Sequence, residues 1–180
     1  MQPTRNPEQL EPFEGDGALQ VVIETPAGNR NKFFWDHEAG VFRLRKVLPA
    51  GMAFPYDFGF VPQTQAEDGD PIDVLLLMDE PAYPGCVIRA RLIGVIEAEQ
   101  TEGGQMVRND RLVAVAEASH EYANVHRLDD LPRKWVEELS LFFVHYQQLE
   151  GKEYRLLGTK DADAAKKLIE KARSGKRRAA

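Results

Sequence analysis

The sequence predicts an α+β fold in which a five-stranded β-barrel is packed by two helices. The first two-thirds of the chain contains short apolar segments separated by Gly, Pro and Asp, which is typical of a small barrel rather than of βαβ units. The last third repeats its apolar residues every three or four positions, as an amphipathic helix does. We expect a single domain over residues 1–180, with an irregular arm at 1–17 and a basic tail at 174–180.

The expected strands are short, and each has a signal of its own. Leu19, Val21 and Ile23 recur at every second position, which indicates a strand with one buried face. Residues 72–77 form an apolar run, which is typical of a strand buried on both faces. The strands are expected at 18–24, 32–35, 41–48, 72–77, 87–99 and 111–116.

Two helices are expected after the strands. Asp130 is placed to cap the first helix, Pro132 lies in its first turn, and Gly151 ends it. Its expected inward face is Trp135, Leu139, Phe142, Phe143, Tyr146 and Leu149. The second, shorter helix runs from about Asp161 to Arg173. Its expected inward face is Ala165, Leu168, Ile169 and Ala172.

Composition excludes several classes of protein. The net charge is −6, and residues 161–180 carry seven Lys or Arg against three Asp or Glu, so the rest of the chain bears −10. Such an acidic body argues against a nucleic-acid partner, which needs a basic surface. The apolar runs are too short to span a bilayer and no signal-peptide pattern is present, so we expect no membrane partner. The single cysteine, Cys86, excludes an internal disulfide and a cysteine zinc site, and the cytoplasm is the expected compartment.

The segment EDGDPIDVLLLMDEP, at 67–81, brings three aspartates together before an apolar strand. Asp68 and Asp70 are two positions apart and in an extended backbone would point the same way, Gly69 permits a tight turn, and Asp73 lies inside the apolar run. Carboxylates this close repel one another, and burying one is costly unless a cation compensates. Mg²⁺ binds a few carboxylates and keeps several waters. An acidic turn would explain Asp68 and Asp70 alone, whereas Asp73 favours a metal site.

Lys46 is the second unusual residue. Along the expected strand 41–48 it shares a face with Phe42 and Leu44, so we expect its ammonium group to point inward, where it needs an anionic partner. A lysine that snorkels at the strand end is the alternative. Other polar residues have equally ordinary explanations, as strand ends or as core packing: Glu24, Lys32, Arg111 and Tyr146. The four histidines have no metal-ligand spacing, and we assign them no role.

The segment DGDPID at 68–73, together with Glu24, Lys32 and the segment FFVHYQQLE at 142–150, resembles the family I soluble inorganic pyrophosphatases. The resemblance runs from about residue 19 to residue 172. It implies an oligonucleotide-binding-fold-like (OB-fold-like) barrel, several bound Mg²⁺ ions with Mn²⁺ as an alternative, and hydrolysis of inorganic diphosphate to two phosphates. It also implies a homo-oligomer, since bacterial members are typically hexamers.

The resemblance assigns roles position by position. Asp70 matches the aspartate that activates the attacking water, so it is the expected catalytic residue. The metal-binding residues that it implies are Asp68, Asp70, Asp73, Glu102, Glu24 and Asp110, with Asn109 as the alternative to Asp110. The substrate-binding residues that it implies are Lys32, Lys46, Arg111 and Tyr146.

Several positions depart from the family pattern. Phe34 stands where the family usually has a glutamate, and Gln147 stands where it has a lysine, so two opposite charges are missing. Lys46 replaces an arginine, Arg111 replaces a lysine, and Phe54 and Phe58 replace tyrosines. We therefore expect Mg²⁺-dependent diphosphate hydrolysis and keep two alternatives. One is a divergent protein that binds Mg²⁺-diphosphate or a nucleotide without efficient hydrolysis. The other is an oligonucleotide-binding module, which the acidic body disfavours.

Overall fold

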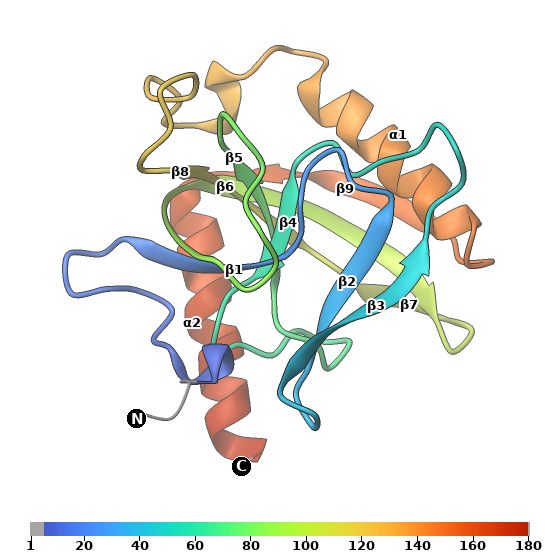
Figure 1. Cartoon of the computed structure of the whole chain (residues 1–180), viewed down its shortest axis with the longest axis horizontal. Coiled ribbons are helices and arrows are strands. Elements are labelled where there is room, and N and C mark those ends of the chain that lie inside the picture. The colour runs from blue at the N-terminus through green and yellow to red at the C-terminus, as the bar shows by residue number, and fades with distance from the viewer. Residues whose placement is uncertain (1–5, 180) are drawn as a thin grey trace.

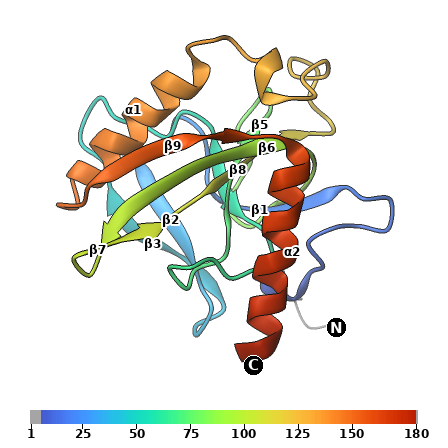
Figure 2. The same cartoon turned by 180° about the vertical axis from the view of Figure 1, so that it is seen from behind.

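The computed structural model describes residues 6–179, with side chains described through residue 173. Figures 1 and 2 show a β-barrel with helix α1 (Trp135–Gln148) across one side and helix α2 (Ala162–Ala179) along another. Helix α2 continues six residues beyond the predicted end at Arg173. The first five residues of the expected arm and the side chains of the expected basic tail lie outside the described part of the chain.

Five strands form a closed ring, as predicted. Their order around the ring is β1 (Leu19–Thr25), β4 (Asp57–Phe60), β5 (Asp73–Leu77), β8 (Arg111–Ala116) and β6 (Val87–Glu102), and β6 pairs again with β1. Four of these pairings are antiparallel, and the pairing of β5 with β8 is parallel. This closed ring is the predicted OB-fold-like barrel.

The composition of the ring differs from the prediction. The predicted strands at 32–35 and 41–48 do form, as β2 (Asn31–Asp36) and β3 (Val41–Val47), but they pair only with each other. Strand β4 takes their place in the ring and was not predicted. Its Gly59 lets β1 approach closely, because a Cβ at this position would lie 2.1 Å from the carbonyl oxygen of Val22.

Two further strands pair with β6 outside the ring, and they were also not predicted. They are β7 (Gln105–Arg108) and β9 (Tyr154–Lys160). Most residues of β9 are exposed, so the strand carries no clear alternation of apolar and polar residues. Two short 3₁₀ helices complete the fold, at Pro7–Gln9 (η1) and Leu128–Asp130 (η2).

Each helix covers its own apolar core. Val74 and Leu76 of β5 belong to the core beneath α2, whereas Leu75 and Leu77 belong to the core beneath α1. This alternation confirms that β5 is buried on both faces. No helix in the described part of the chain is long and apolar enough to cross a membrane.

The start of α1 corrects one expectation, and its end confirms another. Asp130 does not cap α1, because its carboxylate accepts hydrogen bonds from the backbone N–H groups of His126 and Arg127. The helix begins later, at Trp135. Gly151 follows its end with φ +68°, in the left-handed region that glycine favours. Leu149, which was expected to face inward, is 53% exposed.

Candidate active site

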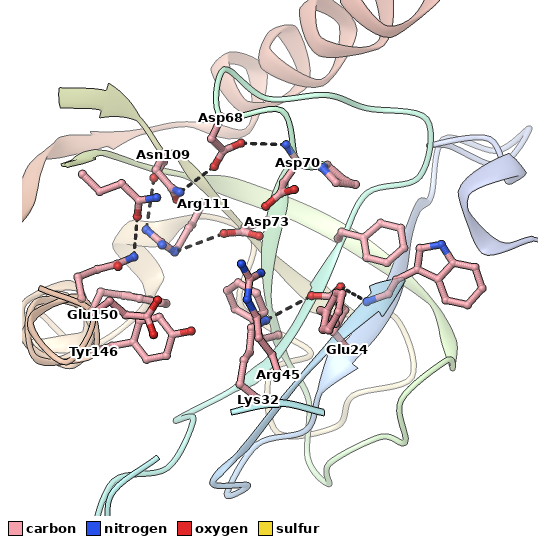
Figure 3. A pocket seen from close by; sticks show the side chains of 18 of the residues that line it. Glu24, Lys32, Arg45, Asp68, Asp70, Asp73, Asn109, Arg111, Tyr146 and Glu150 are labelled. Atoms are coloured by element: carbon pink, nitrogen blue, oxygen red, sulfur yellow. Dashed lines mark hydrogen bonds and ion pairs between the residues drawn. The ribbon is translucent and has the colours of Figure 1, made fainter. Parts of the chain in front are cut away.

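One pocket of about 270 Å³ gathers most of the residues singled out from the sequence. Its lining comes from the barrel, the β2–β3 hairpin and the C-terminal end of α1. Figure 3 shows Asp68 and Asp70 on one side of it, Lys32 and Arg45 on the opposite side, and Asp73 between them. Acidic and basic side chains thus face each other across a small volume.

Asp68 and Asp70 lie in a tight turn just before β5. The turn depends on Gly69, whose φ is +92°, and the backbone N–H of Asp70 donates to the Asp68 carboxylate at 3.2 Å. The two aspartates therefore do not lie in the extended backbone that the sequence suggested. Asp70 is exposed, whereas burial raises the pKa of the half-buried Asp68 above its usual range.

Asp73 is the first residue of β5 and lines the pocket. It shares a strand face with Leu75 and Leu77, as the sequence predicted. Burial raises the pKa of Asp73 to about 7, although Arg111 and Lys32 nearby act in the opposite direction. The Nε atom of Arg111 lies 3.8 Å from the Asp73 carboxylate. That distance allows an ion pair but is too long for a hydrogen bond, so Arg111 leaves room for a second cation beside this carboxylate.

Lys32 and Glu24 form a buried ion pair beside the aspartates. The Lys32 ammonium lies 3.3 Å from Glu24 and 3.9 Å from the centre of the Phe58 ring. Burial lowers the pKa of Lys32. Glu24 also accepts the backbone N–H of Trp35 at 2.8 Å, so both of its oxygens have partners. In this geometry Glu24 positions Lys32, and its role toward a metal stays a prediction.

Arg45, rather than Lys46, lines the pocket. Lys32 of β2 faces Lys46 of β3, but the next residue, Phe33, faces Leu44. Arg45 therefore has no partner in β2 and forms a β-bulge. A bulge of this kind re-aims the side chains around it. Of the face expected to point inward, Leu44 is 53% exposed, whereas Phe42 is partly buried and Leu48 is buried. Arg45 therefore lines the pocket where Lys46 was expected, and the substrate-binding role of Lys46 stays a prediction.

Lys46 instead contacts the end of α1. Its ammonium lies 2.5 Å from Glu150 and 3.9 Å from the centre of the Tyr146 ring. Burial raises the pKa of Tyr146, which therefore keeps its proton over the physiological range and can donate a hydrogen bond into the pocket. A second ion pair, between Lys152 and Glu102 at 2.5 Å, also lies at the pocket lining.

Three neutral amides line another part of the pocket. Gln147 donates to Gln100 at 2.5 Å, and both side chains are buried. The Asn109 amide N–H donates to Asp68 at 3.0 Å, whereas its amide oxygen is buried without a hydrogen-bond partner. An unpartnered buried oxygen beside Asp68 is suited to a cation or a water molecule.

Asp110, which was expected to be a metal ligand, is not part of this pocket. Neighbouring residues of an extended chain point to opposite sides, and the structure brings Asn109 inward and Asp110 outward. The Asp110 carboxylate accepts the backbone N–H of Ala98 and two bonds from Arg108. Asn109 thus takes the place expected of Asp110.

The pocket fits Mg²⁺ by the chemistry of its donors. The oxygens available are the carboxylates of Asp68, Asp70 and Asp73, Glu102, and the unpartnered amide oxygen of Asn109. In the described part of the chain no three His, Cys, Asp or Glu side chains converge closely enough to form one metal site. Each ion would therefore take one or two protein ligands and keep its waters, as Mg²⁺ commonly does.

Six charged, amide or histidine side chains line the pocket although the sequence did not connect them with the site: Glu8, His37, Arg45, Gln100, Glu150 and Lys152. A bulge hides Arg45, and no local pattern marks Gln100 as pocket-facing. Taken together, the lining residues are mainly oxygen donors and cations. A barrel pocket that places oxygen donors opposite fixed cations suits a metal-dependent protein with a phosphate-bearing ligand.

Comparison with known proteins agrees with a metal-dependent protein of this kind and identifies its family. The inorganic pyrophosphatase family matches residues 21–176. An inorganic pyrophosphatase from Synechocystis is 41% identical over 154 residues, covering 86% of this chain and 89% of that protein. The crystal structure of the Thermus thermophilus inorganic pyrophosphatase has a TM-score of 0.87 at 29% identity, covering 96% of this chain and 99% of that one. A Neisseria gonorrhoeae inorganic pyrophosphatase has a TM-score of 0.85 at 33% identity, covering 94% and 98%. The chain belongs to the inorganic pyrophosphatase family.

Proposed function

We propose that this protein hydrolyses inorganic diphosphate to two phosphates in the pocket described above, with Mg²⁺ as its metal. The observation that carries the proposal is the joint lining of one pocket by Asp68, Asp70 and Asp73 and by cations. The cations are Lys32, Arg45, Arg111 and Lys152. Family membership supports the choice of substrate.

The acidic residues would hold the metal, and the role of each follows from its surroundings. Asp68, Asp70 and Asp73 would supply carboxylate oxygens, Glu102 one more, and Asn109 its unpartnered amide oxygen. When bound, Mg²⁺ supplies a water of lowered pKa and stabilises charge on the phosphoryl oxygens. Mn²⁺, which also binds to carboxylates, is the alternative metal.

Asp70 is suited to accept the proton of the attacking water. It is the most exposed of the three aspartates, and its carboxylate makes no ion pair within the described side chains. A general base must be able to approach the proton that it removes. Asp68 accepts a hydrogen bond from Asn109, and Asp73 lies beside Arg111 at the start of β5, so both are more confined than Asp70.

The cations and Tyr146 would hold the two phosphoryl groups. Arg111 is only 3% exposed, its Nε has no hydrogen-bond partner, and its guanidinium lies over the Phe143 ring at 4.0 Å. A fixed guanidinium of this kind stabilises charge that develops on a leaving phosphate. Lys32 and Arg45 approach from the hairpin side, and Tyr146 from α1.

A second candidate function rests on the neutral part of the pocket. Gln100, Asn109 and Gln147 carry no charge, and Phe34 lines the same pocket. Such a pocket favours a divergent protein that binds Mg²⁺-diphosphate without efficient turnover. Phosphate release from Mg²⁺-diphosphate, measured beside calorimetric binding of the same ligand, separates the two. Binding with turnover supports the enzyme, and binding without turnover supports the alternative.

The same proposal covers the state of the protein in solution. We expect one domain over residues 1–180, a cytoplasmic location and a homo-oligomer, with a hexamer as the specific expectation. Large apolar side chains are exposed on α1 and β9, at Leu141, Leu149, Leu156 and Leu157, and are available for contact between copies. Light scattering coupled to size exclusion tests the hexamer, and a monomer at micromolar concentration would contradict it.

A further inference from the structure

The chain before β1 is more than an irregular extension. Residues 6–18, called the arm below, lie before the start of the family match at residue 21. Phe13 packs against the core beneath α2, and the backbone of Gln20 donates to Pro12 at 2.8 Å. The start of the arm lies beside α2 (Figures 1 and 2), where Glu11 pairs with Arg173. The arm is therefore held at several points.

The four acidic residues of the arm differ in their partners. Glu11 pairs with Arg173, and Glu14 and Asp16 both pair with Arg89 of β6. Glu8 is different, since its carboxylate has no hydrogen bond or ion pair with any described side chain. Glu8 is also the acidic residue of the arm that lines the active-site pocket. Three carboxylates thus anchor the arm, and one faces the site without a counter-charge.

The arm is bonded to the segment that carries the aspartates. Gln63, between β4 and Asp68, donates from its side-chain amide to the backbone carbonyl of Gln9 at 3.1 Å. Gln63 has φ +54° and is the single non-glycine residue with positive φ among residues 6–179. A backbone in this region persists only where its surroundings hold it. The bond to the arm is one such contact, and it places η1 next to the aspartate loop.

We propose that the arm forms a wall of the active site and that Glu8 contributes its carboxylate to Mg²⁺ binding there, through water at the rim of the pocket. The inference rests on the proposed function for the identity of the metal. A negative charge at the rim raises the local concentration of a divalent cation and offsets its charge. Because η1 fixes Glu8, with the Asn6 side chain accepting its backbone N–H at 2.9 Å, the carboxylate is presented from an ordered segment.

Calorimetric titration of Mg²⁺ into the full-length, metal-free protein tests this role without any turnover. We expect Glu8→Gln to weaken Mg²⁺ binding by about three- to tenfold, the effect of removing one partly screened charge near the ion. Glu8→Lys should weaken it further. Thermal melts in EDTA check that both variants fold. Loss of hydrolysis in the wild type would overturn the proposed function, while leaving this binding result intact.

The matched control is Glu14→Gln, which removes the same charge from the same arm at a position outside the pocket. Its Mg²⁺ dissociation constant should stay close to that of the wild type. The proposal is overturned if Glu8→Gln binds Mg²⁺ as tightly as the wild type. Asp16 still pairs with Arg89 in Glu14→Gln and keeps the arm anchored. The proposal is equally overturned if Glu14→Gln weakens binding by the same factor, because the effect would then not be specific to the carboxylate that lines the pocket.

Discussion

Arg111 and Asp73 face each other across the parallel pair of strands β5 and β8, with the Nε of Arg111 3.8 Å from the Asp73 carboxylate. The two charges attract, yet the distance is too long for a hydrogen bond. Asp73 therefore keeps an oxygen available for a cation, and Arg111 keeps a donor available for a phosphate. Burial outweighs both Arg111 and Lys32, so the pKa of Asp73 rises to about 7.

The raised pKa of Asp73 predicts how stability depends on pH in the metal-free protein. The folded state holds a proton on Asp73 up to about pH 7, whereas the unfolded chain releases it near pH 4. The free energy of unfolding should therefore fall as the pH rises from about 4 to about 7, by at most about 4 kcal/mol. Denaturant unfolding in EDTA at several pH values measures this slope.

Asp73→Asn is the control for this prediction, since asparagine keeps the shape and cannot ionise. The variant should lose less stability than the wild type between pH 5 and pH 7.5. Mg²⁺ should restore stability to the wild type at pH 7.5 by binding the folded state. Equal slopes for the two proteins in EDTA would show that Asp73 is already ionised without metal.

Asp70 is predicted to be the general base. Asp70→Asn keeps an oxygen ligand but cannot accept the proton, so turnover at saturating Mg²⁺ should fall by roughly two to four orders of magnitude. The exposed Asp129→Asn, in η2, should change little. Asp79 is a poor control because its carboxylate accepts hydrogen bonds from Ser119, His120 and Glu121. Undiminished turnover in Asp70→Asn would remove the residue from the mechanism.

Arg45 and Lys46 should differ in their effects on activity. Arg45 lines the pocket, so Arg45→Ala should lower kcat/KM by about 10- to 100-fold, the usual worth of a hydrogen bond to a charged group. Lys46 does not line the pocket, although its partner Glu150 does, so Lys46→Ala removes only a partly exposed ion pair and its effect should be less than fivefold. Steady-state kinetics measures both variants. A larger loss of kcat/KM in Lys46→Ala than in Arg45→Ala would support Lys46 as the substrate-binding residue.

Gly59 is predicted to be essential for closing the barrel. A methyl group at this position would lie 2.1 Å from the carbonyl oxygen of Val22, so Gly59→Ala must push β1 and β4 apart. We expect a loss of about 3 kcal/mol or more in the free energy of unfolding, which is typical of overpacking at a rigid site. Gly28→Ala is a milder comparison, because nothing lies near its Cβ position and only its φ of +72° is strained. Similar losses of stability in Gly59→Ala and Gly28→Ala would show that the close contact with Val22 is not the cause.

The class of fold could be predicted because its strongest signals are local. The apolar run of β5, the alternation of β1 and the inward face of α2 each appear in a short window of sequence. The strand of the ring that is missing from the prediction is β4, which has four residues and contains a glycine. Its place in the ring depends on pairing with β1 and β5, which are distant in the sequence.

The candidate site could be predicted from the aspartate-rich segment at 67–81 and, for Lys32 and Arg111, from the resemblance to the pyrophosphatase family. Asp68, Asp70, Asp73, Lys32 and Arg111 all line the pocket. Two side chains lie elsewhere than expected. The bulge in the hairpin brings Arg45 to the pocket lining in place of Lys46, and of the two alternatives Asn109 and Asp110 only Asn109 lines the pocket. Glu8 could not be predicted, because only the tertiary fold brings the arm to the pocket.

The most direct test of the proposed function is phosphate release by the purified full-length protein given diphosphate and Mg²⁺. We predict that two phosphates appear for each diphosphate consumed, that EDTA abolishes the reaction, and that Asp70→Asn slows it by roughly two to four orders of magnitude. A folded protein that releases no phosphate in either Mg²⁺ or Mn²⁺ would contradict the assignment.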